Sequence, residues 1–383
     1  MRFFLSETYA LKWLETPSVY NVESDELYEL DDESFEFLKE CSSRDGGLSE
    51  NREFTDYCLV EGILVHEGVK CRRPPLMKSP RPSLRYLELQ ITDRCNLRCR
   101  HCYIGESGNR ELSLDDIGKV LTEFEKMQGL RLLITGGEPL LHSRFAEINR
   151  MLPEFALRKV LLTNGTLLHR ERLEELNFHE IQISIDGLEN AHDLLRGTGT
   201  FRASLDAARN CLDKGFDVSV STMVHSANLN DFDAMEKLFR GMGIKDWTVD
   251  VPCPAGRMKS NKDLQVSPAE GGRCLAYGYG GWIHSGSPGF ACGLHLMSVS
   301  ADGRVSKCTF YSATPAGSSA DGLAACWQRI APVRLADLKC DCIHLENCRG
   351  GCRYRGEILD GPQGRDLYRC AMYDIISSDD VQA

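Results

Sequence analysis

The sequence predicts an α/β protein whose centre is a partial, TIM-like (β/α)6 barrel, with a small module before it and a cysteine-rich domain after it. Short apolar segments alternate with helical patterns from residue 86 to residue 255, which is typical of a parallel sheet. Ten of the 17 cysteines fall in two groups, one just after the first predicted barrel strand and one near the C-terminus. A length of 383 residues suggests two or three domains.

The charge balance argues against two classes of partner. A net charge of −11 and a pI near 5.5 do not favour nucleic acid or an anionic membrane, because phosphate binding needs a basic surface. No apolar run approaches the length of a membrane span. The first residues, MRFFLSETYALKWLE, interrupt their apolar stretch with Glu7 and Lys12 and offer no small-residue cleavage site. We therefore expect a cytoplasmic protein, in which reduced cysteines bind metal rather than form disulfides.

Residues 1–70 are expected to form a module of their own. Its predicted elements are two strands around a polar turn, a helix that Asp32 caps, and a further apolar segment, with the strands at residues 19–22 and 27–30 and the segment at 58–65. This order resembles the winged-helix, PqqD-like domain that holds leader peptides in ribosomal peptide maturation. A cap that closes the bottom of the barrel is the alternative. Residues 71–85, which include a Pro-rich run, are predicted to be a linker.

The barrel is predicted over residues 86–255. Its expected strands are 86–92, 131–135, 159–163, 181–185, 217–223 and 247–251. Between the first two strands, Ser113 and Asp116 can form a capping box for an amphipathic helix. Ligands bind such barrels at the carboxyl ends of the strands, which is where this sequence places its polar motifs.

The first cysteine group follows the first predicted strand. In LELQITDRCNLRCRHC, three cysteines share one short loop: Cys95, Cys99 and Cys102. Three thiolates this close can hold three irons of an iron–sulfur cube and leave the fourth iron open to a small molecule. A structural zinc site is the alternative, but zinc prefers four ligands, and the nearest further candidate, His101, is adjacent to Cys102.

This CxxxCxxC loop resembles that of the radical S-adenosylmethionine (SAM) superfamily. The resemblance implies that the open iron binds the amino and carboxylate groups of SAM, and that reduction of the cluster releases a 5'-deoxyadenosyl radical. The residue before the last cysteine is commonly aromatic in this family and here is His101. We expect His101 to change how the adenine of SAM packs against this loop.

Later strands are followed by further family motifs. Gly136, Gly137 and Glu138 match the GGEP motif, in which the glycines let the backbone approach a ligand and the carboxylate can accept a bond from the SAM ammonium. The resemblance places four more residues in the SAM pocket, namely Asn164, Ser184, Asp186 and Arg196. Ser184 and Arg196 would hold the SAM carboxylate. For Asn164 and Asp186, an Asx turn leaving the strand is the alternative.

Residues 256–383 carry the second cysteine group and are expected to form a domain. The spacing resembles the SPASM domain, whose pattern is C, a gap, GxxxxC, a longer gap, CxxCxxxxxCxxxC and a final C. The resemblance implies two auxiliary 4Fe–4S clusters, and hence three 4Fe–4S clusters in all. The first auxiliary cluster would be held by Cys292, Cys308 and Cys352, and the second by Cys340, Cys342, Cys348 and Cys370.

Two features depart from the SPASM pattern. Cys340-Asp341-Cys342 is one residue shorter than the family's CxxC, and Asp341 could replace a thiolate. The first auxiliary cluster also lacks an obvious fourth ligand. Cys274 could serve, or the iron could be open to a substrate thiolate.

Relatives with this architecture mostly modify peptides or proteins. Sulfatase maturases among them carry Asp directly after the cysteine that matches Cys308, whereas this chain has Thr309, which argues against formylglycine formation. We therefore expect a maturase that uses SAM to cross-link a ribosomally made peptide oxidatively, through thioether or carbon–carbon bonds, with ferredoxin or flavodoxin as electron donor.

Two other functions stay open. Relatives of the haem pathway act on carboxylate side chains of small molecules, and the turn Pro254-Ala255-Gly256-Arg257 would suit such an anion about as well as a peptide carboxylate. The third possibility is an electron carrier without catalytic activity. The intact GGEP motif and the segment Ser184-Ile185-Asp186-Gly187 argue against a carrier, because a carrier needs no SAM pocket.

Overall fold

The computed structural model describes residues 2–68, 70–280 and 288–376. Its main sheet contains six parallel strands in chain order, β6 (Tyr86–Thr92), β7 (Arg131–Gly136), β8 (Arg158–Thr163), β9 (Glu180–Ser184), β10 (Asp217–Met223) and β11 (Asp246–Asp250). Each strand pairs with the next in parallel. This confirms the predicted partial (β/α)6 barrel, and each strand boundary lies within about one residue of the expected one.

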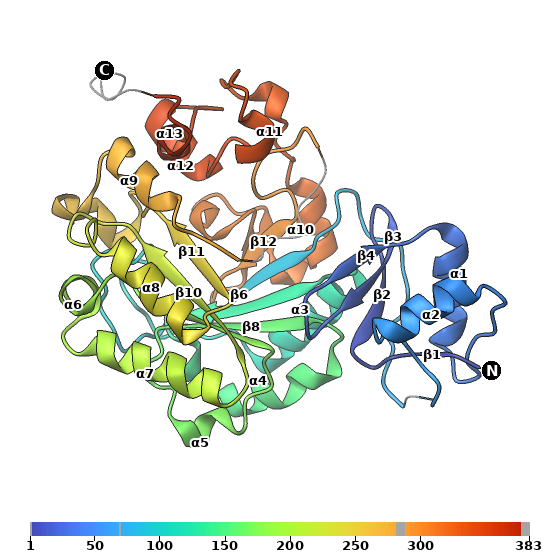
Figure 1. Cartoon of the computed structure of the whole chain (residues 1–383). Coiled ribbons are helices and arrows are strands. Elements are labelled where there is room, and N and C mark those ends of the chain that lie inside the picture. The colour runs from blue at the N-terminus through green and yellow to red at the C-terminus, as the bar shows by residue number, and fades with distance from the viewer. Residues whose placement is uncertain (1, 69, 281–287, 377–383) are drawn as a thin grey trace.

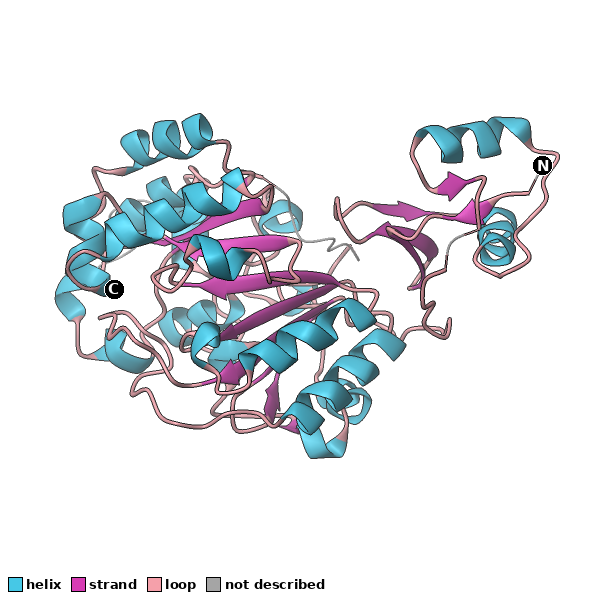
Figure 2. Ribbon diagram, turned by 90° about the horizontal axis from the view of Figure 1, so that it is seen from below, coloured by secondary structure: helices cyan, strands magenta, loops and turns pink. Residues whose placement is uncertain are grey.

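The connecting helices lie on the outer face of the sheet (Figure 2). They are α3 (Leu114–Lys126), α4 (Phe145–Met151), α5 (Arg170–Leu173), α6 (Glu189–Arg196), α7 (Thr200–Asp213) and α8 (Phe232–Met242). As predicted, α3 begins after Ser113, whose hydroxyl accepts from the backbone N–H of Asp116 (3.1 Å). Alternate residues of β6 enter the apolar core under these helices, among them Leu87, Leu89 and Ile91.

The N-terminal module stands beside the barrel (Figure 1, blue). Its elements are β1 (Phe4–Leu5), β2 (Tyr9–Trp13), β3 (Pro17–Asn21), β4 (Leu27–Glu29), α1 (Asp32–Cys41), α2 (Arg52–Val60) and β5 (Leu64–Val65). Strands β2, β3 and β4 form one antiparallel sheet, and β1 pairs with β5. The predicted capping residue was wrong by one position. Asp31 is in the extended conformation and accepts from the N–H of Ser34 (2.7 Å), which makes Asp32 the first helical residue.

One hairpin of this module covers the amino-terminal end of the barrel. Leu14 and Tyr20 form a small apolar cluster with Leu130, which directly precedes β7. Lys12 is fully buried and donates from Nζ to the carbonyls of Gly129 (2.7 Å) and Ala156 (3.0 Å). Burial lowers the pKa of Lys12 to about 8. These contacts attach the module to the end of the barrel that lies opposite the polar motifs.

The C-terminal third lies over the carboxyl ends of the barrel strands (Figure 1, orange and red). Strand β12 (Leu296–Val299) extends the barrel sheet parallel to β6, and β13 (Arg304–Ser306) and β14 (Gly317–Ser318) follow antiparallel. Its helices are α9 (Pro268–Leu275), α10 (Leu323–Arg329), α11 (Leu345–Cys348), α12 (Arg353–Asp360) and α13 (Leu367–Met372). Over the described ranges, no helix has both the length and the apolar character that a membrane crossing requires.

Candidate functional site

A cavity of about 550 Å³ lies between the carboxyl ends of the barrel strands and the C-terminal third. Two groups of cysteines line it, one from the loop after β6 and one from the C-terminal third: Cys95, Cys99 and Cys102, and Cys292, Cys308, Cys348 and Cys352. Gly136, Gly137, Asn164, Ser184 and Arg196 lie on the barrel side of the same cavity. The structure therefore brings most of the expected site residues to one place.

The two glycines of the GGEP motif let the chain approach the cysteine loop. The N–H of Gly137 donates to the carbonyl of Thr92 (2.8 Å), and the N–H of Glu138 donates to that of Arg94 (2.7 Å). A Cβ on Gly137 would lie 2.4 Å from the carbonyl oxygen of Arg94. The sequence predicted that these glycines let the backbone approach a ligand. In the structure they let it approach the segment that carries Cys95.

Glu138 is fully buried and is not among the residues that line the cavity. Its carboxylate accepts from the hydroxyl of Thr163 (2.9 and 3.0 Å) and from the backbone N–H groups of Asn164 (3.0 Å) and Leu140 (3.3 Å). Burial raises the pKa of Glu138 to about 7, and these donors oppose the rise. The carboxylate therefore joins the end of β7 to the end of β8. Its oxygens already accept hydrogen bonds from protein donors.

The buried state of Glu138 gives a pH-dependent stability. Between its ordinary pKa of 4.5 and its folded value of about 7, the folded chain keeps a proton that the unfolded chain has released. The cofactor-free protein is therefore expected to lose up to roughly 3 kcal/mol of stability as the pH rises through this window. Urea unfolding at pH 5 and pH 7.5 measures the loss, and Glu138→Gln should not show it. Equal pH slopes for the two proteins would contradict this assignment.

Asn164 links the barrel to the cysteine loop. Its Nδ2 donates to Asn96 Oδ1 (3.0 Å), and its Oδ1 accepts from the N–H of Thr166 (2.9 Å). The second bond is the Asx turn named above as the alternative for this residue. Asn164 also lines the cavity, so this residue both forms the Asx turn and belongs to the pocket.

Asp186 lies behind Arg196 rather than in the cavity. It is fully buried, and its Oδ2 is 2.5 Å from Arg196 Nε, while its Oδ1 accepts from the N–H of Met223 (2.7 Å). Although burial opposes ionisation, the guanidinium of Arg196 holds the pKa of Asp186 below its usual range. Arg196 Nη1 then lies 3.9 Å from Cys99 Sγ and faces the cavity with Ser184. Asp186 thus fixes the orientation of Arg196.

His101 packs against the same carboxylate. Its Nε2 is 3.9 Å from Asp186 Oδ2, and 12% of its side chain is exposed, toward the cavity that it lines. Burial lowers the pKa of His101 to about 3, so the ring is neutral. The residue that departs from the family pattern therefore presents an uncharged ring to the cavity.

The kind of ligand that lines the cavity fits the iron–sulfur clusters expected from the sequence. Seven cysteine thiols lie in the cavity wall, and thiolates are the usual ligands of such clusters. Basic side chains lie among them and can balance the negative charge of such clusters: Arg196, Arg257, Lys307, Arg353 and Arg369.

Charge effects link the four cysteines that the sequence assigns to a second auxiliary cluster, Cys340, Cys342, Cys348 and Cys370. The charges of Cys342 and Cys348 affect the pKa of Cys340, and those of Cys340 and Cys348 affect the pKa of Cys370, after the larger effect of burial. Asp341, the residue within the shortened spacing, is exposed.

The other group contains Cys292, Cys308 and Cys352, each of which lines the cavity. Cys274 lies outside this group. It is buried on α9 in the apolar core of the barrel, away from the cavity wall.

Sequence reasoning missed two residues near the cavity. Cys253, in the loop after β11, is buried, and an interaction with the Cys352 side chain raises its pKa, a proximity that only the fold reveals. Glu88, on β6, faces the cavity and interacts with the hydroxyl of Thr309. The signal for Glu88 was in the alternation of LELQIT, since Leu87 and Leu89 point to the helices and Glu88 therefore points inward.

Aromatic rings connect the two cysteine groups along one wall of the cavity. Tyr103 follows Cys102, and its ring centroid is 5.5 Å from that of Phe310, which lies close to Cys308. The Phe310 ring stacks in turn on Tyr354, with centroids 5.3 Å apart. A substrate in the cavity would lie against this wall.

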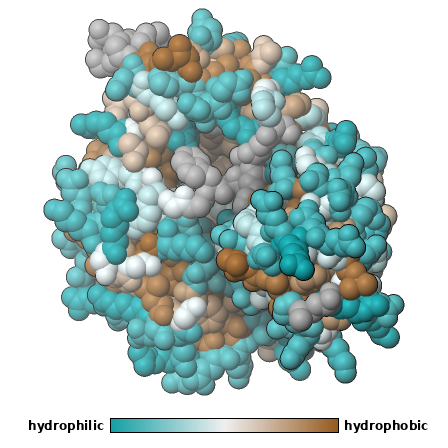
Figure 3. Space-filling view, turned by 45° about the vertical axis from the view of Figure 1, so that its right-hand side comes forward, coloured by the Kyte–Doolittle hydropathy of each residue, from teal (hydrophilic) through white to brown (hydrophobic). Residues whose placement is uncertain are grey.

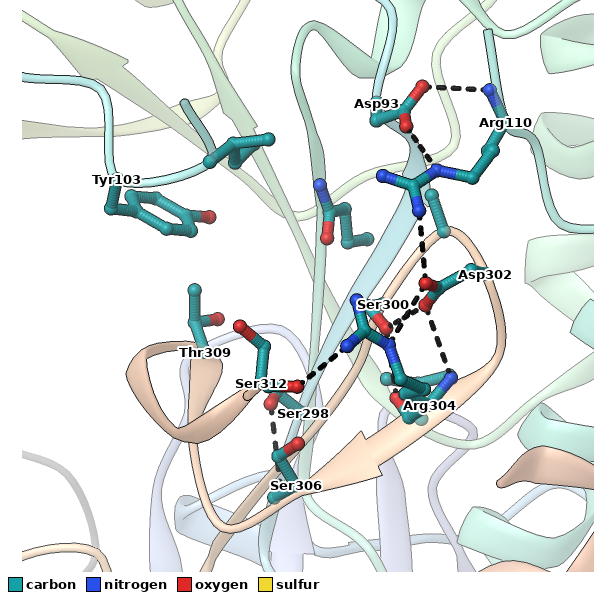
Figure 4. Close-up of a pocket in the computed structure, with 14 residues that line it drawn as sticks. Asp93, Tyr103, Arg110, Ser298, Ser300, Asp302, Arg304, Ser306, Thr309 and Ser312 are labelled. Carbon is teal, nitrogen blue, oxygen red and sulfur yellow. Dashed lines mark hydrogen bonds and ion pairs between the residues drawn. The ribbon is translucent and has the colours of Figure 1, made fainter. Parts of the chain in front are cut away.

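A smaller pocket of about 100 Å³ shares Tyr103 and Thr309 with the large cavity. In Figure 4, Arg110 lies between Asp93 and Asp302, with separations of 2.6 and 3.1 Å. Asp302 also accepts from Arg304 Nε (2.9 Å). These charges satisfy one another, so the network fastens the start of the cysteine loop to the β12–β13 hairpin.

Comparison with known proteins finds a family model that matches most of the barrel. Residues 89–239 match the model of the radical SAM superfamily. The AdoMet-dependent heme synthase of Nitratidesulfovibrio vulgaris is 29% identical over 205 residues, which cover 51% of this chain and 56% of that protein. The chain thus spans about half the length of this curated relative, and 38% of the Fe-coproporphyrin III synthase of Methanosarcina barkeri.

Other similarities extend over more of the chain. The mycofactocin maturase MftC of Mycolicibacterium smegmatis is 28% identical over 321 residues, covering 72% of this chain and 81% of that protein. The crystal structure of Streptococcus suis SuiB bound to S-adenosylmethionine superposes with a TM-score of 0.68 at 14% identity, over 94% of this chain and 98% of that one. The second similarity shows a shared fold that includes the N-terminal module.

Proposed function

We propose that this chain, a radical SAM enzyme through the domain at residues 89–239, cleaves SAM reductively to a 5'-deoxyadenosyl radical and uses it to oxidise a ribosomally made peptide, forming a thioether or carbon–carbon cross-link. The observation that carries the proposal is the single cavity into which both cysteine groups open. A substrate in this cavity would lie between the site of radical formation and an electron acceptor.

The residues on the barrel side fit SAM bound to an open cluster. Cys95, Cys99 and Cys102 would hold a 4Fe–4S cluster, which supplies the electron that cleaves SAM when a donor such as ferredoxin or flavodoxin reduces it. Arg196, oriented by Asp186, would take the SAM carboxylate together with Ser184. The backbone at Gly136 and Gly137 would accept the ammonium, because Glu138 is occupied.

The comparisons support a peptide over a small molecule. MftC, named as a maturase, matches 72% of this chain, whereas the heme synthase matches 51%. The fold of SuiB bound to its precursor peptide SuiA covers 95% of this chain. The second candidate function is modification of a carboxylate-bearing tetrapyrrole, favoured by Arg257, which lines the cavity and has a buried Nη1 without a hydrogen-bond partner in the structure.

We further propose that the N-terminal module binds the leader part of the peptide. Strand β4 is one of the two edges of its sheet, since among the described strands it pairs with β3 alone. A strand added there would gain main-chain hydrogen bonds. The face seen in Figure 3 is mostly hydrophilic with separate hydrophobic patches. Leu48, Tyr57 and Val60 are exposed apolar residues of the module, Val60 by 84%.

A proline on this edge tests the proposal. The N–H of Leu30 donates to Pro17 and that of Asn21 to Glu26, so alternation leaves the N–H of Glu29 pointing outward. Glu29→Pro should lower turnover of a full-length precursor about tenfold or more and leave SAM cleavage without peptide unchanged. Truncation of the module is a poorer test, because it would uncover Leu130 and the partners of Lys12.

The matched control is Asp32→Pro, which adds a proline three positions away at the first helical residue, where proline is tolerated. Turnover is measured by peptide mass spectrometry with precursors encoded beside the gene, and an iron porphyrin bearing propionates is incubated in parallel. Equal turnover by the two variants would remove the leader-binding role. Conversion of the porphyrin alone would move the assignment to the second function.

A further inference from the structure

The small pocket beside the large cavity offers hydroxyl groups rather than unpaired charges. The charged residues of its lining pair with one another, Asp93 with Arg110, and Asp302 with both Arg110 and Arg304. The lining also contains six hydroxyl-bearing side chains: Tyr103, Ser298, Ser300, Ser306, Thr309 and Ser312. A pocket that is polar but carries no unpaired charge suits water better than an ion.

One of these hydroxyls indicates a bound molecule other than protein. Ser306, the last residue of β13, is 2% exposed, and its Oγ has no hydrogen-bond partner among the described residues. A buried hydroxyl without a partner is costly, and such groups are usually satisfied by ordered water. The pocket of about 100 Å³ has room for about three water molecules, at about 30 Å³ each. We therefore expect the pocket to be hydrated.

The small pocket and the large cavity meet at Thr309. Thr309 and Tyr103 line both, and Figure 4 shows them together on one side of the small pocket, across from the paired charges. Strand β6 contributes Glu88 to the large cavity and Gln90 to the small pocket, since residues two apart share one face of a strand. Burial raises the pKa of Glu88, and an interaction with the Thr309 hydroxyl opposes the rise. Thr309 thus lies between a carboxyl group of the large cavity and the small pocket.

The proposed reaction leaves a proton in the large cavity. Forming a thioether replaces one C–H bond and one S–H bond by one C–S bond. The C–H hydrogen atom goes to the 5'-deoxyadenosyl radical, one electron passes to an oxidised iron–sulfur cluster, and the proton of the S–H group remains. A carbon–carbon cross-link leaves a proton in the same way. Because a bound peptide obstructs the large cavity, this proton needs another route to solvent.

We propose that the small pocket is the exit for this proton, which passes from Glu88 through the Thr309 hydroxyl to water in the pocket. A hydroxyl can accept a proton on one side while it donates its own on the other, so Thr309 transfers the proton without holding a charge. The proposal rests on the proposed function, because it is the oxidation of a substrate in the large cavity that leaves a proton there.

The first test compares Thr309→Val with Thr309→Ser. Val has nearly the shape of Thr but no hydroxyl, whereas Ser keeps the hydroxyl. A precursor encoded beside the gene is incubated anaerobically with SAM, and the ratio of modified peptide to 5'-deoxyadenosine is measured. We expect Thr309→Val to lower this ratio about tenfold or more and Thr309→Ser to retain it. An unaltered ratio for Thr309→Val would overturn the inference.

The second test removes the water without touching the substrate. Ser306 lines the small pocket and is not among the residues that line the large cavity. Ser306→Leu fills the pocket, and the matched control Ser306→Ala removes the same hydroxyl but leaves room for water. We expect the Leu variant to lower the product ratio as Thr309→Val does, and the Ala variant to retain most of it. Iron content and 5'-deoxyadenosine formation show whether each variant is folded. Equal ratios for the two folded variants would contradict the proton exit.

A third measurement needs neither a substitution nor a peptide. In a crystal structure of the full chain reconstituted with iron and sulfide, ordered water should join Ser306 Oγ to Thr309 Oγ1. A dry pocket, or one filled by another molecule, overturns the inference even where Ser306→Leu does not fold. If the unaltered enzyme modifies no precursor, the proposed function fails instead, and the water structure still shows whether the pocket is hydrated. The two failures are thereby told apart.

Discussion

Replacing Cys95, Cys99 and Cys102 together by Ala is expected to abolish SAM cleavage and to remove about four of about twelve bound irons. These thiols line the barrel side of the cavity, on the loop that the GGEP segment holds in place. The thiols proposed for the auxiliary clusters lie on other segments, so those clusters should remain. Iron is counted after anaerobic reconstitution, and cleavage is followed as 5'-deoxyadenosine formed with dithionite.

The matched control removes three other thiols. Cys41, Cys58 and Cys211 are each 1% exposed or less, and burial raises the pKa of each, as expected of cysteines that pack as small apolar residues. Their replacement by Ala should keep the iron and the cleavage activity. A control protein that loses four irons, or a loop variant that still forms 5'-deoxyadenosine, would contradict the assignment of the first cluster.

The sequence was sufficient for the barrel because each of its strands carries a local signal. Alternation and short apolar runs located β6 to β11, and the Ser113 cap located the start of α3. Capping was less certain where two acidic residues are adjacent. Asp31 and Asp32 have the same side chain, so the sequence does not show which of them caps α1. The backbone is extended at residue 31, which makes Asp31 the N-cap.

The site was predicted less completely, because a motif names residues but not the direction of their side chains. Glu138 and Asp186 belong to recognisable motifs that predicted a place in the SAM pocket. In the structure, Glu138 joins the ends of two strands, and Asp186 orients Arg196. Cys253 carries no spacing signal at all. The loop that carries Cys253 is held to the C-terminal third by Arg355, which is more than a hundred residues away in the chain from Val251. Such a long-range contact is a property of the packed fold.

Glu88→Gln is expected to lower formation of the modified peptide by about a hundredfold or more while SAM cleavage continues. When a substrate gives one hydrogen atom to the 5'-deoxyadenosyl radical and one electron to an acceptor, a proton is left for a base to remove. Sulfatase maturases carry an Asp at the position of Thr309. Here Glu88 faces Thr309 from strand β6 and interacts with its hydroxyl, so a carboxylate reaches the same part of the cavity from another element.

The environment of Glu88 suits this role. Burial raises the pKa of Glu88 and the Thr309 hydroxyl opposes the rise, which makes the carboxylate a stronger base near neutral pH. Gln has the same shape but cannot take the proton. Adding Thr309→Asp to Glu88→Gln should restore part of the product, because it returns a carboxylate to the cavity. Peptide mass and 5'-deoxyadenosine are measured in one anaerobic incubation. Glu88→Gln enzyme that forms product at the unaltered rate would exclude Glu88 as the base.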